Sequence, residues 1–411
     1  MMRWFVLSLW MMSLVAPRAS AQHEHEESTF HDTITLDELL RLVRSMSPRA
    51  RVLRAEAALA EADVALAGVY PNPTLSYIFM GRFDGTPEAI NGSQHQAWFD
   101  VPLLIAGQHD ARRDAAAATA HAVHGEIEVS LLALEVDARR AFARLLATQE
   151  KLELLDAALA ELRGLEHVVE ARTRAGAQSP YDVTRIAVEL GRMRAMVANA
   201  TVEARAASAN LATLLGLSEW HPRAEGQLEP IGLSAPRDQD AHPMIEAARR
   251  RVLAAERDLR RAEIERWPEI SLGGGGYFTT DGDSMSGYLG LSIPLPIFDT
   301  GEAAVRRARV ARDAAIESRD AVTHETSTRL VGALAVMRAR REALETFRLD
   351  TAERLPELRA MAESSYRLGL SSIFELLDGF RTRLEVESTR IDMNLDFIEA
   401  ELDVLIIVGG R

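Results

Sequence analysis

The sequence predicts a mainly α-helical protein with a small β part, in which long coiled-coil helices connect to short strands. Three observations predict this fold: an apolar stripe of heptad spacing between Gly107 and Gly176, four short segments of alternating polarity, and a set of motifs that occurs twice. The 411 residues include 47 basic and 61 acidic ones, a net charge of −14, and no cysteine. Disulfides and thiolate metal sites are therefore excluded, and the acidic balance argues against nucleic acid as a partner.

The N-terminus is predicted to be a cleavable secretory signal, residues 1–21. Arg3 precedes an apolar run over residues 4–15, and Ala19-Ser20-Ala21 supplies the small-x-small pattern of a cleavage site. The run is too short to cross a bilayer core of about 30 Å, which takes roughly 20 helical residues. A buried N-terminal helix is the alternative.

Residues 22–35 form a tail rich in histidine and glutamate. His23, His25 and His31 could chelate a divalent cation, because imidazole suits zinc, copper and nickel. A solvated segment without a ligand is the alternative. We predict no cofactor, and no metal site beyond these weak candidates.

The rest of the chain is predicted to be two copies of one unit. The segment Arg174-x-Gly176-x-x-Ser179 recurs as Arg367-x-Gly369-x-x-Ser372, and other proline and glycine motifs recur at a nearly constant offset. We assign residues 36–216 to the first repeat, 217–241 to a Pro/Gly-rich linker and 242–409 to the second repeat.

Each repeat is predicted to open with a helix, over residues 36–67 and 243–266, followed by a β-hairpin. The hairpins cover residues 74–104 and 269–298, with strands over 74–83, 94–104, 269–279 and 287–298. Leu75, Tyr77 and Phe79 share one face of the first strand, and this period-2 pattern between turn residues is typical of hairpins.

A long helix is predicted after each hairpin. The first lies between Gly107 and Gly176, where proline is absent; at 1.5 Å per residue it spans about 100 Å. Its stripe consists of Ile127, Leu131, Leu134, Ala138, Ala141, Leu145, Leu152, Leu155, Leu159 and Leu162, with Thr148 as a polar member. The second, over residues 302–368, contains Pro356, where a kink or short break is expected. A bend where the wall narrows and simple tolerance of the proline are the two interpretations of that break. A shorter helix returns after each.

Four strands of about ten residues have the length of tilted membrane-spanning strands. Alone they leave two edges unpaired, and lipid offers those edges no hydrogen-bond partner. Closure by symmetry solves the problem when several subunits contribute four strands each to one barrel. The long helices would then form a coiled-coil cylinder in the same assembly.

Three segments carry a family resemblance: Tyr70-Pro-Asn-Pro-Thr-Leu75, Pro294-Leu-Pro-Ile-Phe-Asp-Thr-Gly301 and Tyr366-Arg-Leu-Gly-Leu-Ser-Ser-Ile-Phe-Glu-Leu-Leu-Asp378. With them, residues 35–409 resemble the TolC superfamily of outer-membrane efflux proteins. Leu-Pro-Ile-Phe-Asp most resembles the CzcC branch, which serves heavy-metal efflux pumps of the resistance-nodulation-division (RND) class.

The resemblance implies a homotrimer with a β-barrel in the outer-membrane lipid of a Gram-negative bacterium and a helical barrel in the periplasm. Such a channel passively conducts exported solute, here heavy-metal cations, from a periplasmic adaptor (membrane fusion protein) and an inner-membrane RND pump. Alternatives are a duct for drugs or type I secreted polypeptides, or a structural periplasmic coiled-coil protein. No Walker loop, GxSxG or HExxH motif is present, so an enzyme is not predicted.

The two repeated turns are the first candidate site. Gly176 and Gly369 suit the left-handed conformation after a helix, and Ser179 and Ser372 suit the caps of the returning helices. Helix punctuation alone explains these residues. The resemblance implies that the same turns, with Arg174 and Arg367, contact the adaptor.

The second candidate site is a constriction at the periplasmic mouth. Glu375 and Asp378 lie on one face of a helix, with Asp182 and Arg185 as their first-repeat equivalents. The resemblance implies rings of carboxylates, which select cations; a solvated helix face is the alternative. Tyr366 matches a position that tethers the closed tip, but Ser371 replaces its usual basic partner. Whether a salt bridge locks the tip gate is therefore left undecided by the sequence.

Overall fold

The computed structural model describes residues 32–81, 93–176, 179–233, 242–279, 284–368 and 370–409, without the side chains of residues 284, 352, 359, 363 and 367. The predicted signal peptide, His23, His25, His31 and Gly369 lie outside the described residues. Within those ranges the chain is mainly helical, with a minor sheet.

The first predicted helix is in fact two helices, α1 (Leu36–Met46) and α2 (Pro48–Ala67). Ser47 between them has ψ 132°, outside the helical range. Proline disfavours a helical conformation in the residue before it, so Pro48 ends one helix and begins the next. The prediction of one continuous helix over residues 36–67 was wrong, whereas α5 (Pro243–Ile264) is continuous as predicted.

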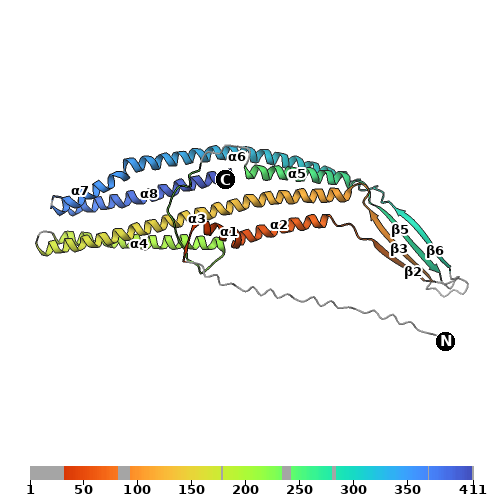
Figure 1. Cartoon of the computed structure of the whole chain (residues 1–411), viewed down its shortest axis with the longest axis horizontal. Helices are drawn as coiled ribbons and strands as arrows, with labels where there is room; N and C mark the ends of the chain where they lie inside the picture. Colours follow the sequence, from red (N-terminus) through yellow and green to blue (C-terminus); the bar gives the residue numbers. More distant parts are fainter. Residues whose placement is uncertain are drawn as a thin grey trace, which may run out of the picture. The chain divides into compact units, whose positions relative to one another are not determined.

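The long first helix is present as α3 (Gln108–Arg174), followed by the returning helix α4 (Pro180–Leu215). Gly107, with φ 83°, precedes α3, and Gly176, with φ 72°, follows it. Leu134, Ala138 and Leu145 of the heptad stripe are buried in one cluster with Leu211 and Leu215 of α4. The stripe therefore packs α3 against its own neighbour in the chain, side by side in Figure 1.

The second long helix is broken. It consists of α6 (Glu302–Asp350), a 3-10 turn (Ala352–Arg354) and α7 (Leu355–Arg367), and α8 (Ile373–Val408) returns. Pro356 lies in the first turn of α7, where its missing N–H leaves no helical bond unmade. The break expected at this proline is confirmed.

Ion pairs hold α8 antiparallel to α3. Arg140 bonds Asp403 at 2.7 Å, Arg144 bonds Glu399 at 2.6 Å, and Lys151 bonds Asp392 at 2.5 Å. Along α3 the basic residues increase in number from 140 to 151, while their partners on α8 decrease from 403 to 392, so the two helices run in opposite directions. The two hairpins of helices, α3 with α4 and α6–α7 with α8, are therefore joined along α3 and α8.

The strands β2 (Thr74–Met80), β3 (Gln94–Leu103), β5 (Ile270–Thr279) and β6 (Ser284–Ser292) form one antiparallel sheet in the order β2-β3-β5-β6. The pair β3–β5 joins the two halves of the chain, whose strands lie side by side in Figure 1. The last strand was predicted over 287–298, which is wrong. It ends at Ser292 because Pro294 and Pro296 have no N–H for the ladder.

Outside this sheet, β1 (Thr33–Ile34) and β4 (Arg223–Ala224) form a short parallel pair. In the described parts of the chain, no helix combines the length and the apolar character needed to cross a membrane.

Candidate functional site

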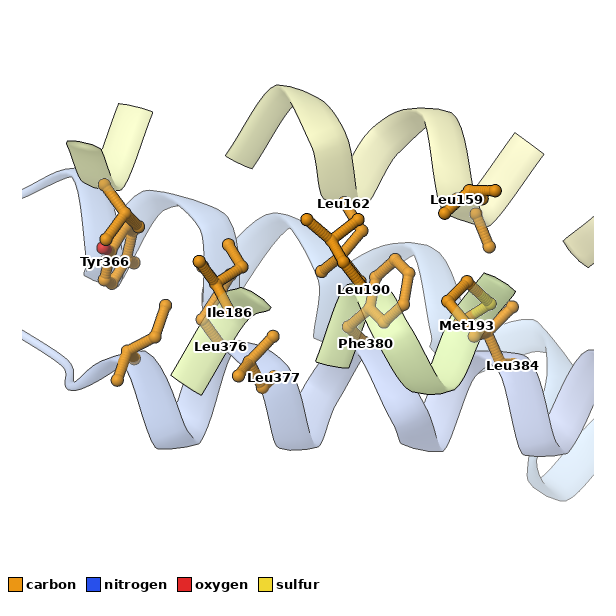
Figure 2. Close-up of a cluster of buried hydrophobic side chains, with 13 residues drawn as sticks. Leu159, Leu162, Ile186, Leu190, Met193, Tyr366, Leu376, Leu377, Phe380 and Leu384 are labelled. Atoms are coloured by element: carbon orange, nitrogen blue, oxygen red, sulfur yellow. The ribbon is translucent and has the colours of Figure 1, made fainter. Parts of the chain in front are cut away.

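The two repeated turns lie at the end of a shared apolar core. The end of α3, the start of α4, the end of α7 and the start of α8 contribute to it, as Figure 2 shows. We call this core the tip cluster; its labelled members are Leu159, Leu162, Ile186, Leu190, Met193, Tyr366, Leu376, Leu377, Phe380 and Leu384. Both turns are therefore fixed by the same packing, although they are far apart in the sequence.

In the first turn, Arg174 is exposed at the end of α3, and Gly176 takes the left-handed conformation. The Ser179 hydroxyl accepts the Tyr181 N–H at 3.2 Å and caps α4. Tyr181 also stacks on Phe374 of α8 with ring centroids 5.9 Å apart. Tyr181 and Phe374 occupy the same place after the two serines of the repeated motif, so the returning helices meet at equivalent positions.

In the second turn, Ser372 is the N-terminal cap residue of α8. Its hydroxyl donates to Oε1 of Glu375 at 3.3 Å, a side-chain bond rather than a bond to the helix backbone. Of the other predicted tip residues, Arg367 is the last residue of α7, and its side chain lies outside the described atoms. Leu368 and Leu370 beside it are exposed.

Tyr366 is buried in the tip cluster, with 3% of its surface exposed. The Arg172 guanidinium lies 5.2 Å from the centre of its ring and donates to its backbone carbonyl at 3.2 Å. Position 371 is a serine, and the cation beside Tyr366 is Arg172 of the opposite hairpin. Arg172 lies in the last turn of α3, two residues before Arg174, and this position next to the repeated motif could have indicated it as a tip residue.

The predicted constriction residues have different surroundings. Glu375 and Asp378 are exposed on α8, whereas Asp182 is half-buried on α4. The Asp182 N–H donates to the Ser179 carbonyl at 3.0 Å, so Asp182 belongs to the first turn of its helix. Arg185, its neighbour one turn on, stacks over Phe374 at 5.0 Å. A single chain therefore presents two exposed carboxylates beside a cation that is already engaged.

An ion pair that the sequence analysis missed braces the tips. Glu189 of α4 is buried, and the Arg381 guanidinium of α8 binds it in a fork, with Nε 3.0 Å from Oε1 and Nη2 on Oε2. The hydrogen bonds from Arg381 lower the pKa of Glu189, aided by the charges of Arg381, Arg192 and Arg185 and opposed by desolvation. The pair crosses from one repeat to the other.

The sheet has two chemically different faces. In antiparallel pairing, residues directly opposite share a face, so Tyr77, Ala97, Gly276 and Gly287 mark one side. Most large side chains of that side are apolar, and the exposed ones are Leu75, Tyr77, Phe79, Phe99, Leu272, Phe278, Met285, Leu289 and Leu291. His95 also lies on that side, with its Nδ1 2.6 Å from the Tyr77 hydroxyl. The other side is richer in polar groups, including Ser76, Gln94, Gln96, Asp100, Tyr277, Ser286 and Tyr288.

The model of the family described as "Outer membrane efflux protein" matches residues 39–217 and 239–410. The cobalt-zinc-cadmium resistance protein CzcC of Cupriavidus metallidurans is 26% identical over 372 residues, which cover 85% of this chain and 84% of that protein. The resemblance to outer-membrane efflux proteins, and to the CzcC branch among them, is thus confirmed.

Solved structures of channels share the fold. CusC superposes with a TM-score of 0.76 at 17% identity, covering 92% of both chains. The outer-membrane channel OprN has a TM-score of 0.73 at 22% identity, covering 92% of this chain and 90% of OprN. The outer membrane protein VceC of Vibrio cholerae has a TM-score of 0.72 at 17% identity, covering 91% and 96%. The chain is a member of the outer membrane efflux protein family.

Proposed function

We propose that this chain is a channel subunit in the outer membrane, where it passively conducts exported solute out of the cell. One observation carries the proposal: a four-stranded sheet with one apolar, exposed face and one polar face. Such a continuous exposed apolar face would promote aggregation of a soluble protein, whereas in a membrane it would contact lipid. The polar face would then meet water in the channel.

The edges of the sheet support assembly from several copies. β2 and β6 are the outer strands of the sheet, each with one neighbour among the described strands. Lipid cannot satisfy their free N–H and C=O groups, so the strands of further copies must pair with them. We take the number of copies to be three, as the resemblance to TolC-type proteins implies, so that each repeat contributes one hairpin to a closed barrel.

The tips support docking of a periplasmic adaptor, which joins the channel to an inner-membrane RND pump. Leu368, Leu370 and Phe374 are exposed around the second turn, next to Ser372. Arg174, Gly176 and Ser179 are exposed at the first. Apolar side chains rimmed by polar ones are typical of a protein interface, and the tip cluster holds them in a fixed arrangement.

We further propose that the cargo is a heavy-metal cation. CzcC is by name a cobalt-zinc-cadmium resistance protein, and Glu375 and Asp378 place two exposed carboxylates near the tip of this chain. In a trimer they would form two rings of three charges, which favour cations. Drugs and secreted polypeptides are the alternative cargo.

The assembly is tested by the molecular mass of the protein in mild detergent. We expect a trimer that dissociates on heating and that opens ion-conducting channels in planar bilayers. A monomer with full β-content and no channel activity would contradict the proposal.

The mouth is tested by the double substitution Glu375→Ala, Asp378→Ala. It should shift the reversal potential toward that of a less cation-selective channel and remove block by cobalt hexammine, because the charged rings are gone. The control is Glu342→Ala, Glu345→Ala, which removes two exposed carboxylates with the same spacing from α6. Equal selectivity in all three proteins would show that Glu375 and Asp378 lie on a solvated outer face.

A further inference from the structure

The polar face of the sheet carries a stacked aromatic pair. Trp98 of β3 and Tyr288 of β6 lie with ring centroids 5.1 Å apart and planes inclined by 13°. The Gln96 side-chain amide donates to the Tyr288 hydroxyl and fixes the outer end of the pair. The two rings reach each other across β5, the strand that lies between β3 and β6.

Glycines under the rings make this arrangement possible. Gly273 and Gly290 are paired across β5 and β6. A Cβ at Gly273 would lie 2.2 Å from Cζ2 of Trp98, and a Cβ at Gly290 would lie 2.8 Å from its Cη2. Both distances are shorter than carbon atoms tolerate without displacement. The indole therefore occupies the space that two side chains would otherwise fill, and lies flat on the sheet.

We propose that Gly273 and Gly290 form a recess that keeps the Trp98 ring against the barrel wall and so sets the width of the bore. The proposal rests on the proposed function, in which the polar face lines the channel. A bulky ring standing off the wall in each of several copies would narrow the passage. Folded into the recess and stacked on Tyr288, the ring leaves the passage free and presents its edge and face to passing solute.

The sheet contains its own control. Gly287 lies on the apolar face, where a Cβ would meet nothing closer than the Gly275 carbonyl oxygen at 3.8 Å. Gly287→Ala adds the same methyl group to the same strand as Gly290→Ala, on the opposite side. Any general cost of replacing a strand glycine should appear in both variants, whereas displacement of Trp98 should appear only in Gly290→Ala.

The position of the ring can be followed by its fluorescence. In a protein with Trp220→Phe and Trp267→Phe, Trp98 is the only tryptophan outside the predicted signal peptide. We expect Gly290→Ala to raise the acrylamide quenching constant of Trp98 at least twofold and to lower the single-channel conductance. Gly287→Ala should change neither. In a Trp98→Ala background, Gly290→Ala should no longer lower the conductance.

Unchanged quenching in Gly290→Ala would overturn the recess, and a displaced ring with unchanged conductance would overturn its role in the bore. If Gly290→Ala fails to assemble, Trp98→Ala alone decides. A ring on the wall predicts a conductance within about a fifth of wild type, whereas a marked rise would show that the ring already stands in the passage. The wild-type protein is the reference in each case. If it forms a conducting trimer, the channel assignment holds and a contrary result in the variants counts against the recess alone.

Discussion

The helices α3 and α6 begin in the same way, after a left-handed glycine that follows a β-hairpin, yet they end up in different surroundings. α3 packs against α2, α4, α5 and α8 and buries side chains along its length, from Ala111 to Val169. α6 buries Val305, Ala308, Thr326 and Leu330 among the described residues, and Val310, Val331 and Val336 are exposed. One helix is the centre of the chain and the other is an outer surface of it.

The difference agrees with the sequence pattern, because the stripe of heptad spacing lies on α3. α3 meets neighbours of the same chain along its length, and its apolar residues enter more than one cluster: Leu134, Ala138 and Leu145 pack with α1 and α4, and Val136, Ala143 and Ala147 pack with α8. The valines of α6 named above stay exposed in the described chain. We attribute them to contacts with further copies, which a trimer would supply.

The strongest way to break this comparison is to place a carboxylate in each helix. Leu145→Asp in α3 puts a charge into a site that is 1% exposed, at a cost of several kcal/mol. We expect loss of the folded chain. Val331→Asp in α6 changes a side chain that is 70% exposed and should leave the helical circular dichroism of the chain intact while weakening the trimer. Circular dichroism and semi-native gels distinguish the two. Loss of helical circular dichroism in Val331→Asp, or a wild-type trimer yield from it, would contradict the account.

Two ion pairs allow the same comparison of a buried and an exposed site, with smaller expected losses of stability. Within the described residues, Arg381→Ala leaves the buried Glu189 with only the longer contact to Arg192, at 3.7 Å. It should cost about 2–4 kcal/mol, somewhat less than a fully buried pair because the Arg381 side chain is 35% exposed. The matched change in α6, Arg341→Ala, removes an exposed i,i+4 pair with Glu345 and should cost under about 0.5 kcal/mol. Urea unfolding of both variants measures the two losses of unfolding free energy. Similar losses for Arg381→Ala and Arg341→Ala would contradict the prediction.

The same pair predicts a pH dependence. Arg381 lowers the pKa of Glu189 below the ordinary glutamate value of about 4.3. Its contribution to stability is therefore fully present above that value and is lost as the pH falls through the lower folded pKa. Heat unfolding of the wild-type chain should become easier as the pH falls below the ordinary glutamate value, and Glu189→Gln should lack this part of the acid dependence. If the thermal stability of wild type and of Glu189→Gln changes with pH in the same way, the predicted contribution of Glu189 is ruled out.

The smallest expected effect comes from two helical glycines. A Cβ at Gly164 of α3 or at Gly332 of α6 would meet nothing within 4 Å in the described structure. Gly164→Ala should stabilise the protein by roughly 0.5–1 kcal/mol through helix propensity. Gly332→Ala should give the same gain in chain stability unless a further copy packs there, in which case trimer dissociation becomes easier. Thermal melts of chain and trimer separate the two cases.

Most of the element order could be predicted from the sequence, because it depends on local signals. Glycines at 107 and 176 bound α3, Pro356 broke the second long helix, and alternation located the hairpins. The errors were also local. The helix predicted over residues 36–67 ran through Ser47 and Pro48, and the predicted fourth strand ran through two prolines that cannot join a ladder.

Contacts between distant residues could not be predicted in this way. Arg172 over Tyr366, Arg381 on Glu189 and Trp98 on Tyr288 all join different helices or strands, and each depends on the register between them. Periodicity shows that a face is buried but does not name its partner. Glu401 illustrates the limit, since it lies buried in a charged part of α8 and accepts the N–H groups of Ile231 and Gly232 at 2.6 and 3.0 Å.

The most direct test of the channel assignment compares two adjacent residues of β6. Met285 lies on the apolar face with 83% of its surface exposed, and Ser286 lies half-buried on the polar face. The chain has no cysteine, so Met285→Cys and Ser286→Cys each give a single thiol. If the polar face lines a water-filled barrel, a charged thiol reagent should alter the current through Ser286→Cys channels and leave Met285→Cys channels unchanged. An altered current in Met285→Cys, or in neither variant, would contradict the account.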